Sequence, residues 1–209
     1  MKFIVFEGLE GCGKTTQMRL LTNKLEAMNI PHTATRQPSD NPIGKLMRSA
    51  TDGFTKMENE TMALLVAADR YQHVYDVITP ALEDGKIVLC DRYYYSSLAY
   101  QGIDPGAFAR VAAYNGLAMA YCKPDITFFL DVRPEECMRR IQAYREYGGA
   151  GYEEYGGLYD SLEQLTLIRE RYIAAFEQLK ETDPVVFIDG IGDQKTVAAQ
   201  ILGHLGIKE

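Results

Sequence analysis

A glycine-rich stretch near the N-terminus has the composition and spacing of a phosphate-binding loop. Residues 6–16 read FEGLEGCGKTT, which places Gly8, Gly13, Lys14 and Thr15 in the pattern G-x-x-x-x-G-K-[ST]. In this pattern backbone N–H groups surround phosphate oxygens, the lysine supplies positive charge, and the hydroxyl binds Mg²⁺. The pattern therefore predicts a nucleotide site with Mg²⁺. Its predicted nucleotide-binding residues are Gly8, Glu10, Gly11, Cys12, Gly13, Lys14, Thr15 and Thr16.

A second group of chemically capable residues follows the apolar run KIVLCD at 86–91. Asp91 ends this run, and Arg92 opens the segment that continues as RYYYSSLAYQG to residue 102. A carboxylate at the end of such a strand organises Mg²⁺ and its water shell in phosphate-transfer sites. Because ligands of open α/β sheets bind at the carboxyl ends of the strands, Asp91 and Arg92 are expected to face the glycine loop. Thr15 and Asp91 are the predicted magnesium ligands.

These residues can meet only if strands and helices alternate, and the chain has that pattern. Five β-rich runs lie at 2–7, 32–36, 86–91, 125–131 and 184–189. Three of them are apolar throughout, as expected of parallel strands that helices cover on both faces. We therefore predict an α/β, three-layer fold of the P-loop NTPase type, with a five-stranded parallel sheet, helices on both faces and a short lid.

Helical periodicity fills the intervals between these runs. Two stripes of large side chains predict core-facing helices: Met18, Leu21, Leu25 and Met28, and Leu162, Leu165, Ile168, Tyr172, Phe176 and Leu179. The segment 57–84 is also helical in pattern and ends at Gly85, with Pro80 as a candidate kink. The glycine- and tyrosine-rich segment 144–157 is the predicted lid, within a single domain spanning 1–209.

Composition narrows the class of partner. The chain has 209 residues and a net charge of -7, which disfavours general binding to nucleic acid or membrane surfaces and favours small-molecule nucleotides. Four cysteines at 12, 90, 122 and 137 lack metal-ligand or CxxC spacing and are expected to be small core residues. No apolar run approaches the roughly 20 residues of a membrane span, and a cytoplasmic location is expected.

Seven segments, in order, resemble the thymidylate kinase family over nearly the whole chain. They are FEGLEGCGKTT, R-x-P at 36–38, PIGKLMR at 42–48, AADR at 67–70, DRYYYSSLAYQG at 91–102, KPDITFFLDVRPEE at 123–136 and LIRERY at 167–172. The resemblance implies transfer of the ATP γ-phosphate to a deoxynucleoside monophosphate, usually dTMP, which gives dTDP for nucleotide biosynthesis. It also implies Mg²⁺ and, commonly, a homodimer.

The resemblance assigns roles to residues on the acceptor side. Glu10 matches the carboxylate that contacts the sugar 3'-hydroxyl, and Arg36 matches the arginine that holds the acceptor phosphate. Arg70 matches the residue that donates to the exocyclic oxygen of the base, with Ser97 near the base edge. Each of these side chains has a plain salt bridge or core contact as its alternative interpretation.

Three further residues are assigned in the same way. Arg92 and Gln101 are expected near the acceptor phosphate. Tyr100 is expected under the sugar, where it would exclude a 2'-hydroxyl and so disfavour ribonucleotides. The alternative of an ordinary core contact is strongest for Gln101, as it is for Ser97.

Phosphoryl transfer needs cations to neutralise charge, with little covalent chemistry from the protein. Lys14, Mg²⁺ and arginines are the predicted sources. The loop positions 9–12 contain no arginine, unlike one branch of the family, so the remaining cation is expected from the start of the lid. Arg140 and Arg145 are the candidates, with Arg145 favoured because it is nearer the lid hinge; the alternative is a solvated helix arginine.

Two departures from the family pattern, at positions 66 and 37, bear on the acceptor. Val66 stands where the family usually has a phenylalanine that stacks on thymine, and base stacking contributes on the order of 1 to 3 kcal/mol. Its loss would weaken or broaden base selection. Gln37 replaces the carboxylate of the family's R-E-P motif. Tyr93, Tyr94 and Tyr95 would either present a ring to the base or pack the start of a helix.

Two other functions stay open at this point. The first is a related P-loop kinase with another deoxynucleotide or a nucleoside as acceptor, which Val66 keeps plausible. Arg36 opposes only the nucleoside, which would give it no phosphate to bind. The second is a non-catalytic, GTPase-like switch. The sequence has no Asn-Lys-x-Asp guanine-reading motif, and DGIGD at 189–193 resembles the family's loop beside adenine.

Overall fold

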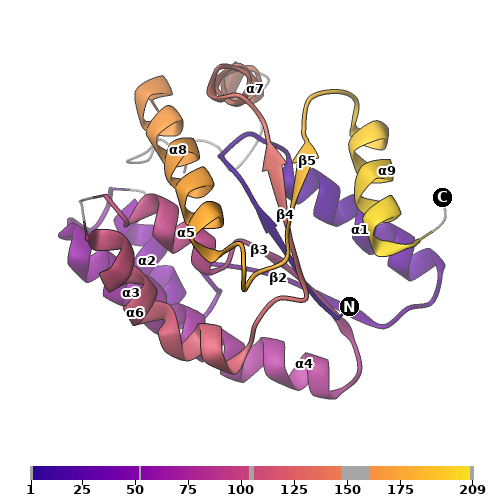
Figure 1. Ribbon diagram of the computed structural model, residues 1–209, viewed down its shortest axis with the longest axis horizontal. Coiled ribbons are helices and arrows are strands. Elements are labelled where there is room, and N and C mark those ends of the chain that lie inside the picture. The colour runs from indigo at the N-terminus through magenta and orange to yellow at the C-terminus, as the bar shows by residue number, and fades with distance from the viewer. Residues whose placement is uncertain (1, 52, 104–105, 147–160, 208–209) are drawn as a thin grey trace.

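The computed structural model describes residues 2–51, 53–103, 106–146 and 161–207. At its centre lies a five-stranded, all-parallel sheet of order β2-β3-β1-β4-β5 (Figure 1). The strands are β1 (Phe3–Glu7), β2 (His32–Arg36), β3 (Ile87–Asp91), β4 (Ile126–Asp131) and β5 (Val185–Asp189). All five predicted strands and their parallel arrangement are confirmed, with starts that differ by at most one residue.

Burial explains why the strands have different sequence patterns. The central strand β1 is buried at every position, and its neighbour β4 is buried at all positions except the last. The outer strands β2 and β5 carry partly exposed side chains along most of their length. The apolar runs of β1 and β4 therefore mark strands that are buried on both faces, and the polar run HTATR marks an edge. The apolar run of β5 does not follow this rule, because β5 lies at the other edge.

Helices form a layer on each face of the sheet (Figure 1). On one face α1 (Lys14–Ala27) packs beside α9 (Gln194–Leu205). On the other lie α3 (Asn59–His73), α5 (Tyr94–Tyr100), α6 (Ala107–Tyr121) and α8 (Leu162–Leu179). The remaining helices are α2 (Pro42–Thr51), α4 (Thr79–Glu83) and α7 (Pro134–Glu146). The described residues thus confirm the three-layer arrangement.

The predicted helix over 57–84 is divided into three parts. It begins as α3, widens into the π-helical segment η1 (Val74–Ile78), and continues as α4. Pro80 has no N–H and its ring excludes the carbonyl four residues earlier, so regular α geometry cannot run through it. The Thr79 N–H accordingly donates to the carbonyl of Val74, five residues back. The interruption expected at Pro80 is therefore a π turn just before it.

Two members of the predicted core stripes are exposed. Met28 is 45% exposed because α1 ends at Ala27 and Met28 caps it. Leu162 is 44% exposed, at the first turn of α8. Leu179 is partly buried, and the other members are buried: Met18, Leu21, Leu25, Leu165, Ile168, Tyr172 and Phe176. Periodicity identified the buried face correctly except at the helix ends, where the chain leaves it.

The four cysteines are buried and unpaired, as predicted. Of the predicted lid, residues 147–157 lie outside the described residues, and 144–146 form the last turn of α7. None of the described helices has both the length and the apolarity needed to cross a membrane.

Candidate functional site

The carboxyl edge of the sheet collects ionisable side chains. Every strand ends in one of them: Glu7, Arg36, Asp91, Asp131 and Asp189. The register pairs Arg36 with Asp91 directly, so β2 and β3 deliver an arginine and a carboxylate side by side. This is the edge at which open α/β sheets bind ligands, so the candidate site lies here.

The glycine loop joins β1 to α1 at this edge. Gly13 caps α1 with a φ of 104°, and a Cβ there would meet nothing within 4 Å. Gly11, with a φ of 75°, is constrained by packing because a Cβ would lie 2.7 Å from the carbonyl oxygen of Cys137. Both φ values favour glycine. The result is an open helix N-terminus, whose free N–H groups suit an anion.

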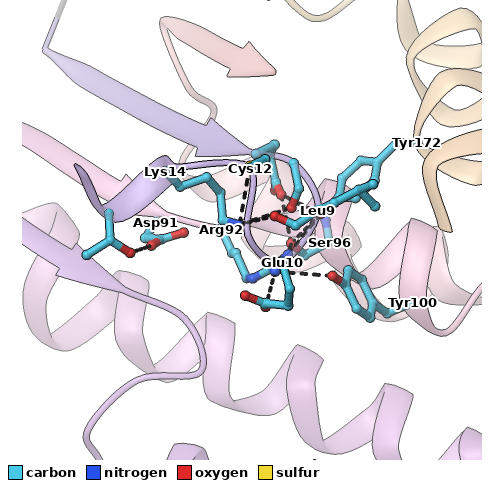
Figure 2. A network of polar contacts seen from close by, with 12 residues as sticks. Leu9, Glu10, Cys12, Lys14, Asp91, Arg92, Ser96, Tyr100 and Tyr172 are labelled. Atoms are coloured by element: carbon cyan, nitrogen blue, oxygen red, sulfur yellow. Dashed lines mark hydrogen bonds and ion pairs between the residues drawn. The ribbon is translucent and has the colours of Figure 1, made fainter. Parts of the chain in front are cut away.

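Lys14 places a positive charge inside this loop. Its Nζ lies 3.1 Å from the Gly8 carbonyl oxygen and 2.9 Å from that of Leu9 (Figure 2). Burial and the charge of Arg92 lower the pKa of Lys14, but the neighbouring Cys12, Glu10 and Asp91 side chains outweigh them and raise it. Lys14 is therefore charged at neutral pH, as a phosphate ligand requires.

Thr15 and Asp91 meet beside the loop. The Thr15 hydroxyl donates to Asp91 Oδ2 at 3.2 Å, which confirms that the two predicted metal ligands are neighbours. Asp91 Oδ1 is buried and has no hydrogen-bond partner among the described residues. Because buried carboxylate oxygens are normally satisfied, this atom fits a cation ligand. The pair suits Mg²⁺, which takes one or two protein oxygens and completes its shell with water and phosphate.

Arg92 connects the end of β3 to the glycine loop. It has a left-handed φ of 68°, uncommon for a residue other than glycine, which directs its side chain back across the sheet edge. Its guanidinium donates to four side chains: the carboxylate of Glu10, the Tyr100 hydroxyl at 3.1 Å, Ser96 Oγ at 3.0 Å and the Tyr172 hydroxyl at 3.1 Å (Figure 2). The structure thus brings Glu10, Arg92 and Tyr100 together, as the sequence predicted.

Beneath Arg92 lies a carboxylate that the sequence analysis did not select. Glu7 is fully buried and accepts from the Tyr93 N–H at 2.8 Å, the Ser96 hydroxyl at 2.7 Å and the Tyr172 hydroxyl at 2.9 Å. Burial raises the pKa of Glu7, against the opposing effect of Arg92 and these donors. An acidic residue that ends an apolar strand directly before the loop was the available signal. Glu7 thus links the start of α5 to Tyr172 in the middle of α8.

Arg36 lies at the exposed side of the site. Its side chain is 55% exposed, and its Nη2 lies 3.0 Å from Asp40 Oδ1, an oxygen that also pairs with Arg48. The hydrogen bond from Arg36 lowers the pKa of Asp40. An arginine in this position can reach a phosphate that enters from solvent.

Arg70 occupies the interior behind the site. It is 1% exposed, and its Nη1 lies 2.7 Å from Ser97 Oγ, so these two predicted base-contacting residues are neighbours. Val66, one turn earlier on α3, is buried against Met47 and Met62. Gln101 is also buried; its N–H donates to the Ser97 carbonyl at 2.9 Å, and its own carbonyl accepts from Asn59 at 3.2 Å. These four residues thus come from α3 and from α5 with its C-cap, two helices that pack together.

Arg140 and Arg145 have different surroundings on α7. Arg140 donates to the Cys12 carbonyl at 3.2 Å and to the Gly190 carbonyl at 3.0 Å, so it ties the glycine loop to the DGIGD loop after β5. Arg145 lies exposed in the last turn of the helix. Of the two candidate cations, Arg140 therefore contacts the glycine loop, and Arg145 lies at the end of α7.

The three consecutive tyrosines belong to the core. Tyr93, Tyr94 and Tyr95 are at most 1% exposed. The Tyr93 hydroxyl donates to the Cys122 carbonyl at 2.8 Å, and the other two hydroxyls donate to Asp183. Of the two interpretations, packing at the start of a helix is confirmed.

Comparison with known proteins gives one consistent result. A family model described as thymidylate kinase matches residues 6–200. A thymidylate kinase of Cutibacterium acnes is 42% identical over 157 residues, covering 72% of this chain and 76% of that protein. A probable thymidylate kinase of Thermococcus kodakarensis is 36% identical over 209 residues, covering 96% and 95%. A thymidylate kinase of Halothermothrix orenii is 36% identical over 202 residues, covering 95% and 93%.

Proposed function

Because this chain belongs to the thymidylate kinase family, whose members phosphorylate dTMP to dTDP with ATP, we propose that the carboxyl edge of its sheet carries out this transfer. One observation carries the assignment of the site. The contact between Arg92 and Glu10 joins the glycine loop, which suits a donor phosphate, to the residues that suit an acceptor nucleotide. Both substrates would then meet at a single cluster of charge.

The donor half is the glycine loop with its helix. The N–H groups at the start of α1 and the Lys14 ammonium would hold the β- and γ-phosphates of ATP. Thr15 and Asp91 would hold Mg²⁺, which when bound neutralises phosphate charge and orients the transferring group. The buried, unpartnered Asp91 Oδ1 supports this role.

The acceptor half lies on the far side of Arg92. Arg36 would bind the phosphate of dTMP through its planar guanidinium, with Arg92 and Gln101 nearby. Glu10 would accept from the 3'-hydroxyl, and the Tyr100 ring would fill the space of a 2'-hydroxyl. Arg70 and Ser97, which contact each other, would contact the base. The catalytic contribution of these residues is alignment of the acceptor oxygen with the γ-phosphate and neutralisation of charge.

Arg140 and Arg145 on α7 would have different roles. Arg140 is proposed to position the glycine loop, since it donates to a carbonyl in that loop. Arg145 is proposed to supply the cation that the loop itself lacks, from the helix end that leads into the segment 147–160.

A panel of acceptors tests the proposed function. The purified protein with ATP and Mg²⁺ is given dTMP, dUMP, dCMP, dGMP or thymidine, and nucleoside diphosphate formation is followed. We expect the highest kcat/KM with dTMP, and partial use of dUMP because Val66 offers no aromatic platform. Lys14→Ala, prepared in parallel, should lose the activity and so exclude a contaminating kinase. Turnover of thymidine but not dTMP would overturn the proposal.

We further propose that the chain forms a homodimer through the outer face of α3 and α6, as the family commonly does. Large side chains are exposed on this face: Leu64 is 50% exposed, Leu117 69%, and Tyr121 59%. The rings of Tyr71 on α3 and Tyr121 on α6 contact each other, so the exposed faces of the two packed helices adjoin. Light scattering of the wild type should give the dimer mass and Leu117→Glu the monomer mass. An unchanged dimer would place the interface elsewhere.

The proposed location is the cytoplasm, where ATP and reduced thiols coexist. The four free, buried cysteines support it, since such thiols persist in a reducing compartment. Fractionation of cells that express the protein tests this.

A further inference from the structure

The guanidinium of Arg70 is almost completely engaged by the protein. Its Nε donates to Gln37 Oε1 at 2.7 Å, its Nη1 donates to Ser97 Oγ and to Asn115 Oδ1, and its Nη2 donates to the Tyr93 carbonyl at 2.9 Å. A guanidinium has five N–H groups and no acceptor. These contacts fix where Arg70 can point, and among the described residues they leave one N–H, on Nη2, without a hydrogen bond.

The contact with Arg70 determines the orientation of the Gln37 amide. Because Arg70 can only donate, the oxygen of the amide must face it, and the NH₂ group must face the other way. On that other side lies His73 Nδ1, 3.0 Å from Gln37 Nε2. The imidazole nitrogen must therefore accept, and so it carries no proton.

The proton of His73 is then on the opposite ring nitrogen. His73 Nε2 lies 2.7 Å from Thr35 Oγ1, to which it can donate. Both Gln37 and His73 are buried, with 5% and 2% exposure, so water cannot replace either partner easily. A chain of oriented hydrogen bonds thus runs from Thr35 on β2 through His73 and Gln37 to Arg70.

From this geometry we propose that Gln37 and His73 are positioning residues for Arg70: the amide holds the guanidinium toward the acceptor base, and neutral His73, protonated on Nε2, holds the amide. The inference rests on the proposed contact of Arg70 with the base. A glutamate at position 37, frequent in the resembled family, would accept from both neighbours and would require the opposite tautomer of His73, with a proton on Nδ1. The orientation is therefore a property of this chain.

Protonation of His73 would break the chain of bonds. In the protonated ring, Nδ1–H would face the NH₂ group of Gln37, so that two donors would meet. Rotation of the amide by half a turn would relieve this contact, but it would bring the NH₂ group against the Nε–H of Arg70, which is again a donor. Burial and the charge of Arg70 lower the pKa of His73, while the carboxylates of Asp69, Asp40 and Asp76 oppose them. We therefore expect the KM for dTMP to rise only as the pH falls below about 6.5, the ordinary histidine pKa.

Long-range proton–nitrogen NMR correlations on the wild-type protein test the tautomer directly. Above the ordinary histidine pKa of about 6.5, His73 should carry its proton on Nε2. His32 is the internal reference with the opposite tautomer, because its Nδ1 lies 2.9 Å from the Ile30 carbonyl, which can only accept. Variants His32→Gln and His204→Gln assign the signals. A proton on Nδ1 of His73 would overturn the proposal.

Substitutions of Gln37 test the positioning role. Gln37→Met removes the acceptor of a bond to a charged group, so the KM for dTMP should rise about tenfold with kcat and the KM for ATP unchanged. Gln37→Glu should keep the KM near wild type, move a proton onto His73 Nδ1 and make the rise of KM at acid pH smaller than in wild type; the rise that remains comes from protonation of the dTMP phosphate. Gln72→Met, which removes a surface amide that bonds Asp76, is the matched control.

The outcomes separate this inference from the proposed function. Failure to phosphorylate dTMP would refute the function, whereas the tautomer is read without any substrate. An unchanged KM for dTMP in folded Gln37→Met would refute the positioning role alone. If that variant does not fold, the wild type is compared with Gln37→Glu: the KM of the wild type must rise more at the pH where the imidazolium signal of His73 appears, and equal rises in the two proteins would refute the role.

Discussion

The guanidinium of Arg92 contacts the carboxylate of Glu10, and this contact joins the end of β3 to the glycine loop. The Arg92 side chain is 13% exposed and that of Glu10 35% exposed, so the pair lies partly out of water. Burial would raise the pKa of Glu10, but the charges of Arg92 and Lys14 outweigh it and hold that pKa at about 2. The loop is thus coupled electrostatically to Arg92 at the end of β3.

This coupling predicts how stability depends on pH. Because the pKa of Glu10 falls from 4.5 to about 2 on folding, its ionised form stabilises the folded state above pH 4.5, and this contribution is lost as the pH falls towards about 2. Glu10→Gln should lower the free energy of unfolding at neutral pH, and its difference from wild type should shrink across that window. Urea denaturation at a series of pH values measures it.

Glu170→Gln, an exposed change on α8, is the matched control and should follow the wild-type profile. A difference between Glu10→Gln and wild type that stays constant between neutral and acid pH would contradict the coupling.

Removal of the proposed metal carboxylate should change the magnesium requirement. Asp91→Asn keeps the shape and the contact with Thr15 but loses the charge, so half-maximal activity should need about tenfold more Mg²⁺. Initial rates at fixed ATP across a range of Mg²⁺ concentrations measure this. Asp84→Asn, which affects only a surface pair with Lys86, should leave the requirement unchanged. Equal magnesium curves for Asp91→Asn and wild type would argue against the assignment.

The Tyr100 ring should enforce the preference for deoxyribose. Tyr100→Ala opens space where a 2'-hydroxyl would lie, so the ratio of kcat/KM for dTMP over ribothymidine monophosphate should fall about tenfold. Tyr100→Phe keeps the ring but loses the hydroxyl that accepts from Arg92 at 3.1 Å. The phenylalanine variant should therefore lose some activity with both substrates and keep the ratio. A ratio that falls equally in both variants would assign the selectivity to the hydroxyl.

Alanine substitutions of Arg140 and Arg145 on α7 should have different effects on stability and kinetics. Arg140→Ala removes the donor that links the Cys12 and Gly190 carbonyls, so Tm should fall and the KM for ATP should rise. Arg145→Ala should lower Tm less than Arg140→Ala does and lower kcat about 100-fold, as loss of a group that stabilises transition-state charge does. Thermal melts and steady-state kinetics measure both. Arg139→Ala, a neighbouring surface change, is the control and should leave kcat unchanged. An unaltered kcat in Arg145→Ala would show that Arg145 has no part in catalysis.

Local patterns were sufficient for the sheet and for the glycine loop. Strand positions, the parallel arrangement and the glycine loop could be predicted because burial on both faces and loop geometry depend on residues close together in the chain. The proximity of Thr15 to Asp91 followed from a topological rule about strand ends. Helix ends were less predictable, as exposed Met28 shows, because the point where a chain leaves the core depends on what covers it.

Tertiary structure alone decided how the acceptor half is supported. Glu7 and Tyr172 are neighbours across 165 positions, and Gln37 reaches Arg70 across 33, so no spacing in the sequence relates them. The sequence marked Gln37 only as a departure from a family motif; packing of α3 against the end of β2 turned it into an oriented amide between Arg70 and His73. The sequence determines which donors and acceptors are present, but a buried hydrogen bond forms only where packing brings a donor and an acceptor together.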